Sequence, residues 1–246
     1  MGSVSKFPWH VVRESGLYVL DFFFPKKCLG CGKTGGYFCP ECLNFVSLDP
    51  QRICPVCERL SIGGRTHPGC QTQTTLDGLT SIFSYKGIIK KGISKLKYHF
   101  VSDLASDLVE IFLGLCGEDK TFSDFCLEKH PCLVPIPLHP RREKWRGFNQ
   151  SALLGKMIAK NLNLDFAPDL IKRIKNTKPQ IKLKEKERKE NIKGAFRVSP
   201  TSHFALLTSP LILFDDVWTS GATLKEAGEV LKRAGAKKVW GLTLAR

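Results

Sequence analysis

Apolar positions in the C-terminal part of the chain follow the pattern of a strand, a loop, a helix and a second strand. Residues 211–214 form a short continuous apolar run, which favours a buried strand. Thr223 and Glu226 fit a capping box that would start a helix, and Gly235 fits its left-handed C-terminal cap. The apolar face of this helix would consist of Leu224, Ala227, Leu231 and Ala234. Residues 239–244 predict a second strand, so the stretch is expected to form a βαβ unit.

The loop between this strand and this helix combines two adjacent carboxylates with small and hydroxyl residues. Asp215 and Asp216 stand where the strand ends. The loop then continues as Thr219, Ser220, Gly221, Ala222 and Thr223. Free backbone N–H groups at a helix start, together with hydroxyl donors, suit a phosphate, whereas the carboxylates suit sugar hydroxyls or a metal ion. The pattern predicts a ribose 5-phosphate site, although Asp and Thr also form ordinary βα turns.

The middle of the chain predicts further strands and helices. Strands are expected at 82–85 and 132–138, and residues 71–80 are polar enough for a linker. Helices are expected at 88–98 and 104–115, because their apolar residues recur at helical spacing. The lysines near the end of the first helix could touch an anionic ligand or could simply be solvated.

A basic loop is predicted at 139–150, and a helix with Asn149 as its N-cap is predicted at 151–161. Aromatic residues stand close to Arg146 on both sides. The cations of the loop are Arg141, Arg142, Lys144 and Arg146. A βα loop of this charge could hold pyrophosphate by charge-assisted hydrogen bonds.

A second basic stretch follows at 171–193, where ten Lys and Arg residues face three Glu. Three interpretations fit it: a solvated insertion, a lid over a pyrophosphate group, or an arm that contacts a nucleic-acid backbone. The lid and the arm would use the same charges, so the sequence does not separate them.

Seven of the ten cysteines lie between residues 28 and 70, and six of them form three pairs in which two residues separate the cysteines. A fourth pair has His67 in the place of its first cysteine. This spacing is typical of knuckles that turn two ligands toward one zinc ion. The simplest partition gives two closed four-ligand sites: Cys28, Cys31, Cys39 and Cys42, followed by Cys54, Cys57, His67 and Cys70. A crossed pairing, a single zinc, or redox-active thiols are the alternatives. A module of this size buries too small a core to fold unaided, so these zincs would be structural.

Charge and hydropathy limit the partners and the compartment. The formal net charge is +15, which favours polyanions such as nucleic acid, anionic membrane or phosphorylated small molecules, or reflects a solvated basic surface. No stretch approaches the ~20 apolar residues that span a bilayer, and we see no signal-peptide pattern. We therefore expect a cytoplasmic protein, with contact to the inner face of the membrane left open.

The order of these parts resembles the ComF family, amidophosphoribosyltransferase-like proteins linked to natural competence. The paired cysteine knuckles come first, and the acidic and hydroxyl-rich stretch from Asp215 to Thr223 comes last. Between them stand 96–98 (Leu-Lys-Tyr), 135–137 (Pro-Ile-Pro) and 146–150 (Arg-Gly-Phe-Asn-Gln), followed by Arg173, Thr177, Gln180, Arg188 and Asn191. The run at 146–150 is the most specific of these motifs. His67 and Trp218 depart from the residues that are more usual in the family.

The resemblance implies an α/β fold of the type I phosphoribosyltransferase class, a parallel sheet flanked by helices, with an N-terminal double zinc ribbon. It implies an N-terminal segment at 1–24, the ribbon at 25–72 and the phosphoribosyltransferase-like domain at 80–246. It also implies binding of phosphoribosyl pyrophosphate (PRPP) with Mg²⁺. The carboxylate pair would bind the ribose hydroxyls, residues 219–223 the 5-phosphate, and Arg146 is a further candidate contact.

Two functions are compatible with these expectations. The first is an enzyme, in which PRPP loses pyrophosphate as its anomeric carbon takes a nucleophile; the protein would supply positioning and charge stabilisation. No general base stands out in the sequence, so the acceptor is unknown, and an enzyme of nucleotide metabolism is one version. The second is a protein that handles incoming single-stranded DNA together with other proteins of the competence machinery. A basic groove with nearby aromatics such as Trp145 would suit that role.

Overall fold

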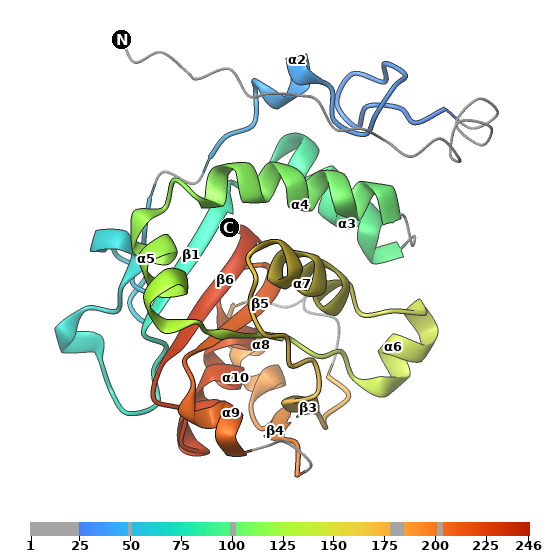
Figure 1. Cartoon of the computed structure of the whole chain (residues 1–246). Coiled ribbons are helices and arrows are strands. Elements are labelled where there is room, and N and C mark those ends of the chain that lie inside the picture. Colours follow the sequence, from blue (N-terminus) through green and yellow to red (C-terminus); the bar gives the residue numbers. More distant parts are fainter. Residues whose placement is uncertain (1–24, 49–50, 99–101, 178–184, 201–203) are drawn as a thin grey trace.

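The structure is a computed structural model that describes residues 25–48, 51–98, 102–177, 185–200 and 204–246 (Figure 1). The predicted N-terminal segment at 1–24 lies outside these residues, as do Gln180 and part of the basic stretch. No helix in the described ranges is long and apolar enough to cross a membrane.

A four-stranded parallel sheet forms the centre of the molecule. Its strands lie in the order β1 (Gly78–Phe83), β6 (Val239–Ala245), β5 (Leu211–Val217) and β2 (Cys132–Pro135). β5 and β6 are neighbours joined by helix α10 (Ala222–Arg233), so the predicted βαβ unit is confirmed. A parallel sheet with helices on both faces also confirms the predicted α/β class.

The central strand β5 is buried on both faces, because successive side chains point to opposite sides of the sheet. Leu211 and Leu213 pack into one apolar core, whereas Ile212 and Phe214 pack into the other. All four side chains are fully buried. This explains why the strand appears in the sequence as a continuous apolar run rather than an alternating one.

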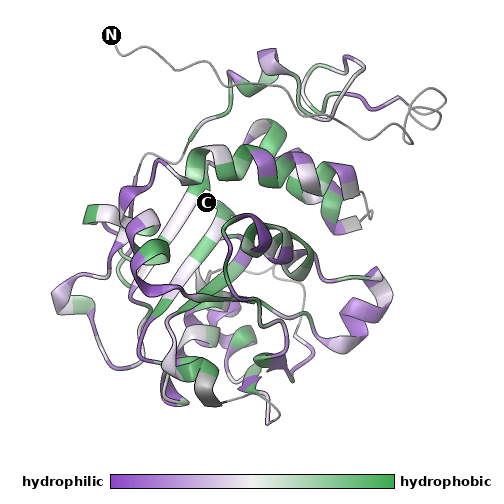
Figure 2. Cartoon of the chain, in the orientation of Figure 1, coloured by the Kyte–Doolittle hydropathy of each residue, from purple (hydrophilic) through white to green (hydrophobic). Residues whose placement is uncertain are grey.

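Helices α3 (Gly87–Tyr98), α4 (Ser102–Cys116), α5 (Lys120–Lys129) and α7 (Gln150–Asn161) supply the core on one face of the sheet. Figure 2 shows hydrophobic residues on the helices and strands that meet there. α7 begins at its predicted cap, where the Asn149 side chain accepts a hydrogen bond from the Ser151 N–H at 3.0 Å. That cap fixes the end of α7 that lies beside the carboxylates of β5.

The other face is covered by α10, α8 (Glu185–Ile192), α9 (Phe204–Thr208) and an antiparallel hairpin. The hairpin consists of β3 (Ile171–Arg173) and β4 (Phe196–Val198). The basic stretch therefore begins in a strand and ends in a helix, and both contribute apolar residues to the core. Only residues 178–184 of the stretch lie outside the described ranges.

The cysteine-containing segment carries the short elements α2 (Pro40–Leu43), η1 (Ile62–Gly64) and η2 (Pro68–Cys70). Its two halves differ in their contacts with the sheet. The second half pairs along the edge of β1 through a bridge from Arg65 to Gly78, and Ile53 belongs to the same core as Leu79. The first half packs on the outside of α3 and α4 (Figure 1) through partly buried residues.

Three local predictions were wrong. The sequence 71–80 is not a linker throughout, because β1 begins at Gly78 and Leu76 is already buried. The basic loop is instead helix α6 (Pro140–Arg146), which ends at Gly147 with a positive φ of 85°. Helix α5 was not predicted at all; its weak apolar pattern is compensated by Asp119, whose side chain caps it by accepting from Phe122 N–H.

Candidate functional site

Two carboxylates lie at the end of the central strand, where β5 continues three residues beyond its predicted bounds. Asp216 is 5% exposed, and its Oδ2 accepts a hydrogen bond from Gln150 Nε2 at 3.0 Å and forms an ion pair with Lys97 Nζ at 2.9 Å. Asp215 Oδ1 accepts from the Ser151 hydroxyl at 2.9 Å. The ends of α3 and α7 thus position both carboxylates before any ligand binds.

The environment of the pair favours uptake of a proton by one member. Burial, together with the neighbouring charge of Asp216, raises the pKa of Asp215 to about 7 against the opposing effect of Lys97. Burial alone would lower the pKa of Lys97, but the charge of Asp216 and its hydrogen bond, together with smaller contributions from Tyr85 and Asp215, outweigh burial and raise it. Near neutral pH the three groups therefore carry little net charge.

The predicted phosphate loop follows directly, and it ends in a helix start without a side-chain cap. Gly221 occupies the N-cap position of α10 with a positive φ of 67°. The capping box is wrong: α10 begins at Ala222 rather than after Thr223, and Glu226 instead accepts a hydrogen bond from Gly194 N–H at 2.7 Å. The Ser220 hydroxyl is buried and has no hydrogen-bond partner in the described part of the chain.

Trp218 determines the shape of this loop. Its side chain is 2% exposed and lies so close to Gly221 that an added Cβ would come within 2.1 Å of the ring. The Lys225 ammonium lies over the ring, 5.2 Å from its centroid. Trp218 is therefore a packing residue of the loop, and glycine is required at position 221 by both its φ and this contact.

Three arginines gather next to the carboxylates. Arg146, at the end of α6, donates to the side-chain oxygen of Gln150, which itself holds Asp216. Arg173 of β3 donates to the Thr177 hydroxyl, and Arg142 donates to the Thr177 carbonyl. Burial and the charge of Arg142 lower the pKa of Arg173 to about 10. Burial and the charge of Arg146 likewise lower the pKa of Arg142.

Two buried N–H groups of the arginine cluster have no hydrogen-bond partner in the described structure, and a bound anion would provide one. The Nε atoms of Arg146 and Arg173 are buried and have none among the described residues. Burial and the mutual repulsion of the arginines both lower these pKa values, and a polyanionic ligand would offset both effects. The sequence placed Arg146 in a loop, but it lies on a helix and reaches the site through Gln150.

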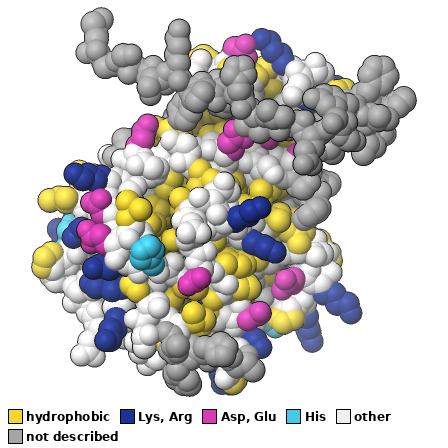
Figure 3. All heavy atoms as spheres, viewed as in Figure 1, with side chains coloured by type: hydrophobic (Ala, Val, Ile, Leu, Met, Phe, Trp, Pro, Cys, Tyr) yellow, Lys and Arg dark blue, Asp and Glu magenta, His cyan; other side chains and the backbone are white. Residues whose placement is uncertain are grey.

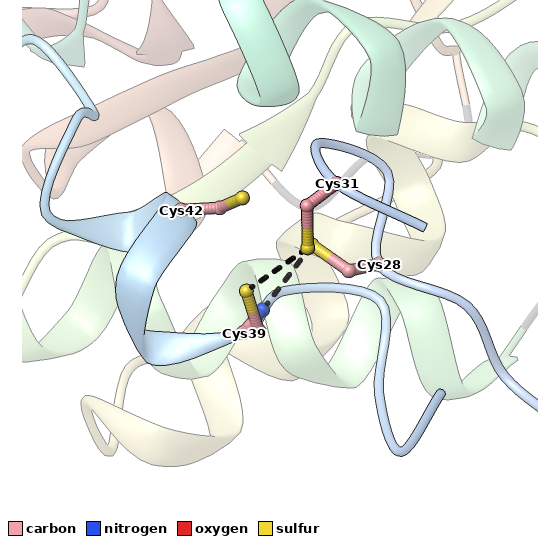
Figure 4. A group of neighbouring side chains, drawn as sticks. All are labelled: Cys28, Cys31, Cys39 and Cys42. Carbon is pink, nitrogen blue, oxygen red and sulfur yellow. Dashed lines mark hydrogen bonds between the residues drawn. The ribbon is translucent and has the colours of Figure 1, made fainter. Parts of the chain in front are cut away.

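The first cysteine group brings four sulfur atoms together. Figure 4 shows Cys42, on α2, pointing toward the space where the sulfurs of Cys28, Cys31 and Cys39 meet. All four lie within 4.8 Å of one another, and the sulfurs of Cys31 and Cys39 are 3.6 Å apart. A tetrahedral zinc with bonds of about 2.3 Å places its sulfurs about 3.8 Å apart. The group could therefore hold zinc.

The second group contains the predicted His67, and its ring is oriented as a ligand. His67 Nε2 lies 2.9 Å from the Leu60 carbonyl oxygen, which can only accept, so this nitrogen carries the proton. Nδ1 then presents a lone pair 3.4 Å from the Cys57 sulfur. A hydrogen bond from the backbone N–H of Arg59 lowers the pKa of Cys57 to about 6.

All four ligand atoms of the second group lie within 4.8 Å of one another: those of Cys54, Cys57, His67 and Cys70. A carbonyl that holds the second ring nitrogen is the usual outer partner of a zinc-bound histidine. Of the partitions considered from the sequence, the structure brings together the simplest one, with two uncrossed groups.

The chain is similar over most of its length to proteins of known name. It is 31% identical to competence protein ComFC of Bacillus subtilis over 226 residues, which cover 90% of this chain and 84% of that protein. The chain belongs to the ComF family. It is 28% identical to the DNA utilization protein YhgH of Escherichia coli over 83% of this chain and 95% of that protein. Competence protein F of Haemophilus influenzae is 34% identical over 115 residues, 46% of this chain and half of that protein.

A scan against models of protein families finds no match. The resemblance stated from the motifs is thus confirmed by individual relatives. The assignment of single residues to a ligand stays a prediction, as do the domain bounds.

Three residues that contact the carboxylate pair were not predicted to do so from the sequence. Gln150 is the last residue of the specific run at 146–150 and Ser151 follows it, and their proximity to the cap Asn149 was the available signal. Lys97 lies more than 100 residues before Asp216 in the sequence, and only the fold brings the two together.

Proposed function

We propose that this protein is a PRPP-binding, phosphoribosyltransferase-like member of the ComF family that acts in DNA uptake by handling incoming single-stranded DNA. The observation that carries the PRPP proposal is the order of polar groups around the end of β5. Three features follow one another within nine residues: a carboxylate pair, the buried Ser220 hydroxyl without a partner among the described residues, and the start of α10, which has no side-chain cap. Ligands of open parallel sheets bind outside the carboxyl ends of the strands, where these groups lie.

Each part of PRPP has a matching group. The 5-phosphate fits the loop that contains Ser220 and Gly221, because hydroxyl and backbone N–H donors favour an anion. The ribose hydroxyls fit Asp215 and Asp216, which can only accept when ionised. The pyrophosphate fits the arginine cluster with its free Nε atoms, since such groups form charge-assisted hydrogen bonds. Mg²⁺ would enter with the pyrophosphate.

The two cysteine groups are proposed as structural zinc sites. Four ligands close each tetrahedron and leave no open position for substrate. The ions would fix the N-terminal module on α3, α4 and the edge of β1 rather than take part in chemistry.

The proposal of a DNA role rests on two relatives and on one surface. The named proteins of Bacillus subtilis and Escherichia coli are described by competence and by DNA utilization. Helix α6 projects from the body of the molecule (Figure 1), is largely hydrophilic (Figure 2) and carries Trp145, which is 74% exposed. Arg141 and Lys144 on the same helix are also exposed. An exposed aromatic between cations suits base stacking with phosphate contacts.

Net charge alone does not locate this surface. On the face shown in Figure 3, Lys and Arg side chains are scattered mostly around the margins. The combination of Trp145 with neighbouring cations is therefore the specific feature of α6. The alternative is a phosphoribosyltransferase of nucleotide metabolism without a DNA role. That function would not explain why a large aromatic side chain, Trp145, is exposed on α6.

The PRPP proposal is tested by calorimetry on zinc-loaded protein, with and without Mg²⁺. Asp215→Asn combined with Asp216→Asn should abolish binding, because the ribose hydroxyls lose the carboxylate oxygens of the pair as acceptors. Glu118→Gln combined with Glu128→Gln is the control, since it removes the same charge from exposed residues. Absence of binding by the unaltered protein at millimolar PRPP would refute this proposal.

The DNA proposal is tested by fluorescence anisotropy with labelled oligo-dT. Trp145→Ala should weaken binding roughly 5- to 150-fold, because stacking of one base contributes ~1–3 kcal/mol. Phe45→Ala removes another exposed aromatic, on the cysteine module, and should have no effect. Equal losses of affinity for oligo-dT in both variants would contradict a specific role of α6 in DNA binding. The double Asp→Asn variant should bind oligo-dT normally if the two sites are separate.

A further inference from the structure

Lys97 is the one cation of α3 that reaches the carboxylate pair in the described structure. Its ammonium lies 2.9 Å from Asp216 Oδ2, and its side chain is 20% exposed. The other three lysines of the helix have other partners: Lys90 lies over the Tyr85 ring, Lys95 lies over the Tyr37 ring, and Lys91 donates to the Leu29 carbonyl. A lysine buried to this degree beside a carboxylate is not a solvated side chain.

The carboxylate oxygen that Lys97 contacts already has two partners. Asp216 Oδ2 also accepts from Gln150 Nε2 at 3.0 Å, and Gln150 is in turn held by Arg146. A divalent cation that used this oxygen would have to displace an ammonium and an amide donor. Mg²⁺ also demands near-ideal octahedral oxygen ligands, so it does not share a carboxylate oxygen with an ammonium at close range.

The charges of these groups also disfavour a bound divalent cation. Lys97 neutralises Asp216, and burial together with Asp216 disfavours the ionised form of Asp215. Little negative charge remains to attract a divalent cation, although acidic residues at the end of β5 would otherwise suit one. The groups around Asp216 Oδ2 therefore do not fit a resident Mg²⁺ at this oxygen.

We infer that Lys97 is the built-in counter-cation of the carboxylate pair. It holds the Asp216 carboxylate in place for the ribose hydroxyls, and it takes the place that a divalent cation would have on the protein. The pocket then binds a ribose monophosphate without Mg²⁺, and any Mg²⁺ that accompanies PRPP is held by the pyrophosphate. The statement about ribose rests on the proposed function, whereas the exclusion of a cation from Asp216 does not.

Three variants separate this role from simple packing. Lys97→Met keeps the length of the side chain and removes its charge. Lys97→Arg keeps a cation and serves as the rescue variant, which also guards against misfolding of the methionine variant. Lys160→Met removes an exposed lysine at the far end of α7 and is the charge-matched control.

The first readout is the affinity for ribose 5-phosphate, measured by calorimetry in a chelator and in millimolar Mg²⁺. Zinc-loaded protein is used, and the chelator is one that leaves the zinc in place. The unaltered protein and Lys160→Met should bind equally in both conditions. Lys97→Met should bind ~10-fold more weakly in chelator, equivalent to ~1.4 kcal/mol, and should recover when Mg²⁺ is added. Lys97→Arg should bind within ~3-fold of the unaltered protein in both.

The second readout is Mn²⁺ binding without sugar, followed by electron paramagnetic resonance. Lys97→Met should gain a Mn²⁺ site that the unaltered protein, Lys97→Arg and Lys160→Met lack. A purely structural lysine would not create a cation site when it is removed. A Mn²⁺ site of equal affinity in all four proteins would overturn the inference.

The outcomes also separate this inference from the proposed function. Ribose 5-phosphate binding that requires Mg²⁺ equally in the unaltered protein and in Lys97→Met would overturn the role of Lys97 and leave a sugar-phosphate site in place. Failure of every protein to bind the sugar would refute the proposed pocket, and the Mn²⁺ titration would still decide whether Lys97 excludes a cation.

Discussion

Two regions of this chain gather ligand-binding side chains, and they do so by opposite means. At the end of β5, a sheet buried on both faces and two helix ends hold Asp215 and Asp216 in place. In the first cysteine group, Cys28 is the only buried residue between 25 and 48. The fold therefore creates the carboxylate site, whereas bound metal would create much of the fold of the cysteine module.

The second cysteine group stands between these extremes. Ile53 and Cys54 are buried, and the segment is paired along the edge of β1. Arg52 connects it further to the body through an ion pair with Asp119 at 3.1 Å. The comparison indicates that the dependence on metal decreases along the chain, from the first group to the second and then to the sheet.

Metal removal should give the largest difference between the regions. Structural zinc contributes about 10–16 kcal/mol to the folding of small zinc modules, so a strong chelator should unfold residues 25–48. Hydrogen exchange should show loss of protection there, a smaller loss at 51–72, and none in β5 and β6. Elemental analysis before chelation should give about two zincs per chain. Uniform loss of protection across the chain would contradict the contrast.

A change in the phosphate loop should damage the site that the fold creates. Gly221→Ala introduces a Cβ that would meet Trp218 and a residue that disfavours a φ of 67°. We expect a loss of ~1–3 kcal/mol in the free energy of unfolding and PRPP binding at least ~10-fold weaker. Gly117→Ala is the control, because its Cβ meets open space. Unchanged PRPP affinity in Gly221→Ala would contradict the assignment of this loop to the PRPP site.

The smallest expected effect concerns the stability of the carboxylate pair. The pKa of Asp215 is raised from 3.8 to about 7, so between these values the folded state holds a proton that the unfolded chain has lost. Stability should therefore fall as the pH rises through this range. Asp215→Asn cannot titrate, and it should exceed the unaltered protein by on the order of 1–2 kcal/mol at pH values above 7.

Urea unfolding across pH measures this difference, which should disappear at pH values below 3.8. Asp169→Asn, at an exposed position, should follow the unaltered protein throughout. Parallel curves for Asp215→Asn and the unaltered protein would show that burial does not raise the pKa of Asp215.

The parts of the fold that the sequence predicted are those with local signals. The strand at 211–214 and the helix that follows it were predicted because a buried parallel strand and an amphipathic helix each leave a characteristic pattern. The cysteine groups were predicted from spacing alone. α6 was missed because its residues are mostly charged and leave no apolar face at helical spacing. Its ends are instead set by the caps His139 and Gly147.

The parts of the site that were missed depend on contacts between distant segments. Glu226 satisfies the rule for a capping box, but Gly194 from another segment uses its carboxylate. Lys97 has no local signal that distinguishes it from Lys95, and only the packing of α3 against the sheet brings it to Asp216.

The most direct test of the account is a crystal structure of the zinc-loaded protein with PRPP bound. The account predicts the 5-phosphate against the Ser220 hydroxyl and the start of α10, the ribose hydroxyls on the carboxylate pair, and the pyrophosphate among Arg142, Arg146 and Arg173. Lys97 should remain on Asp216, with any Mg²⁺ on the pyrophosphate alone. PRPP bound elsewhere, or with its phosphate away from Ser220, would contradict the assignment of this site.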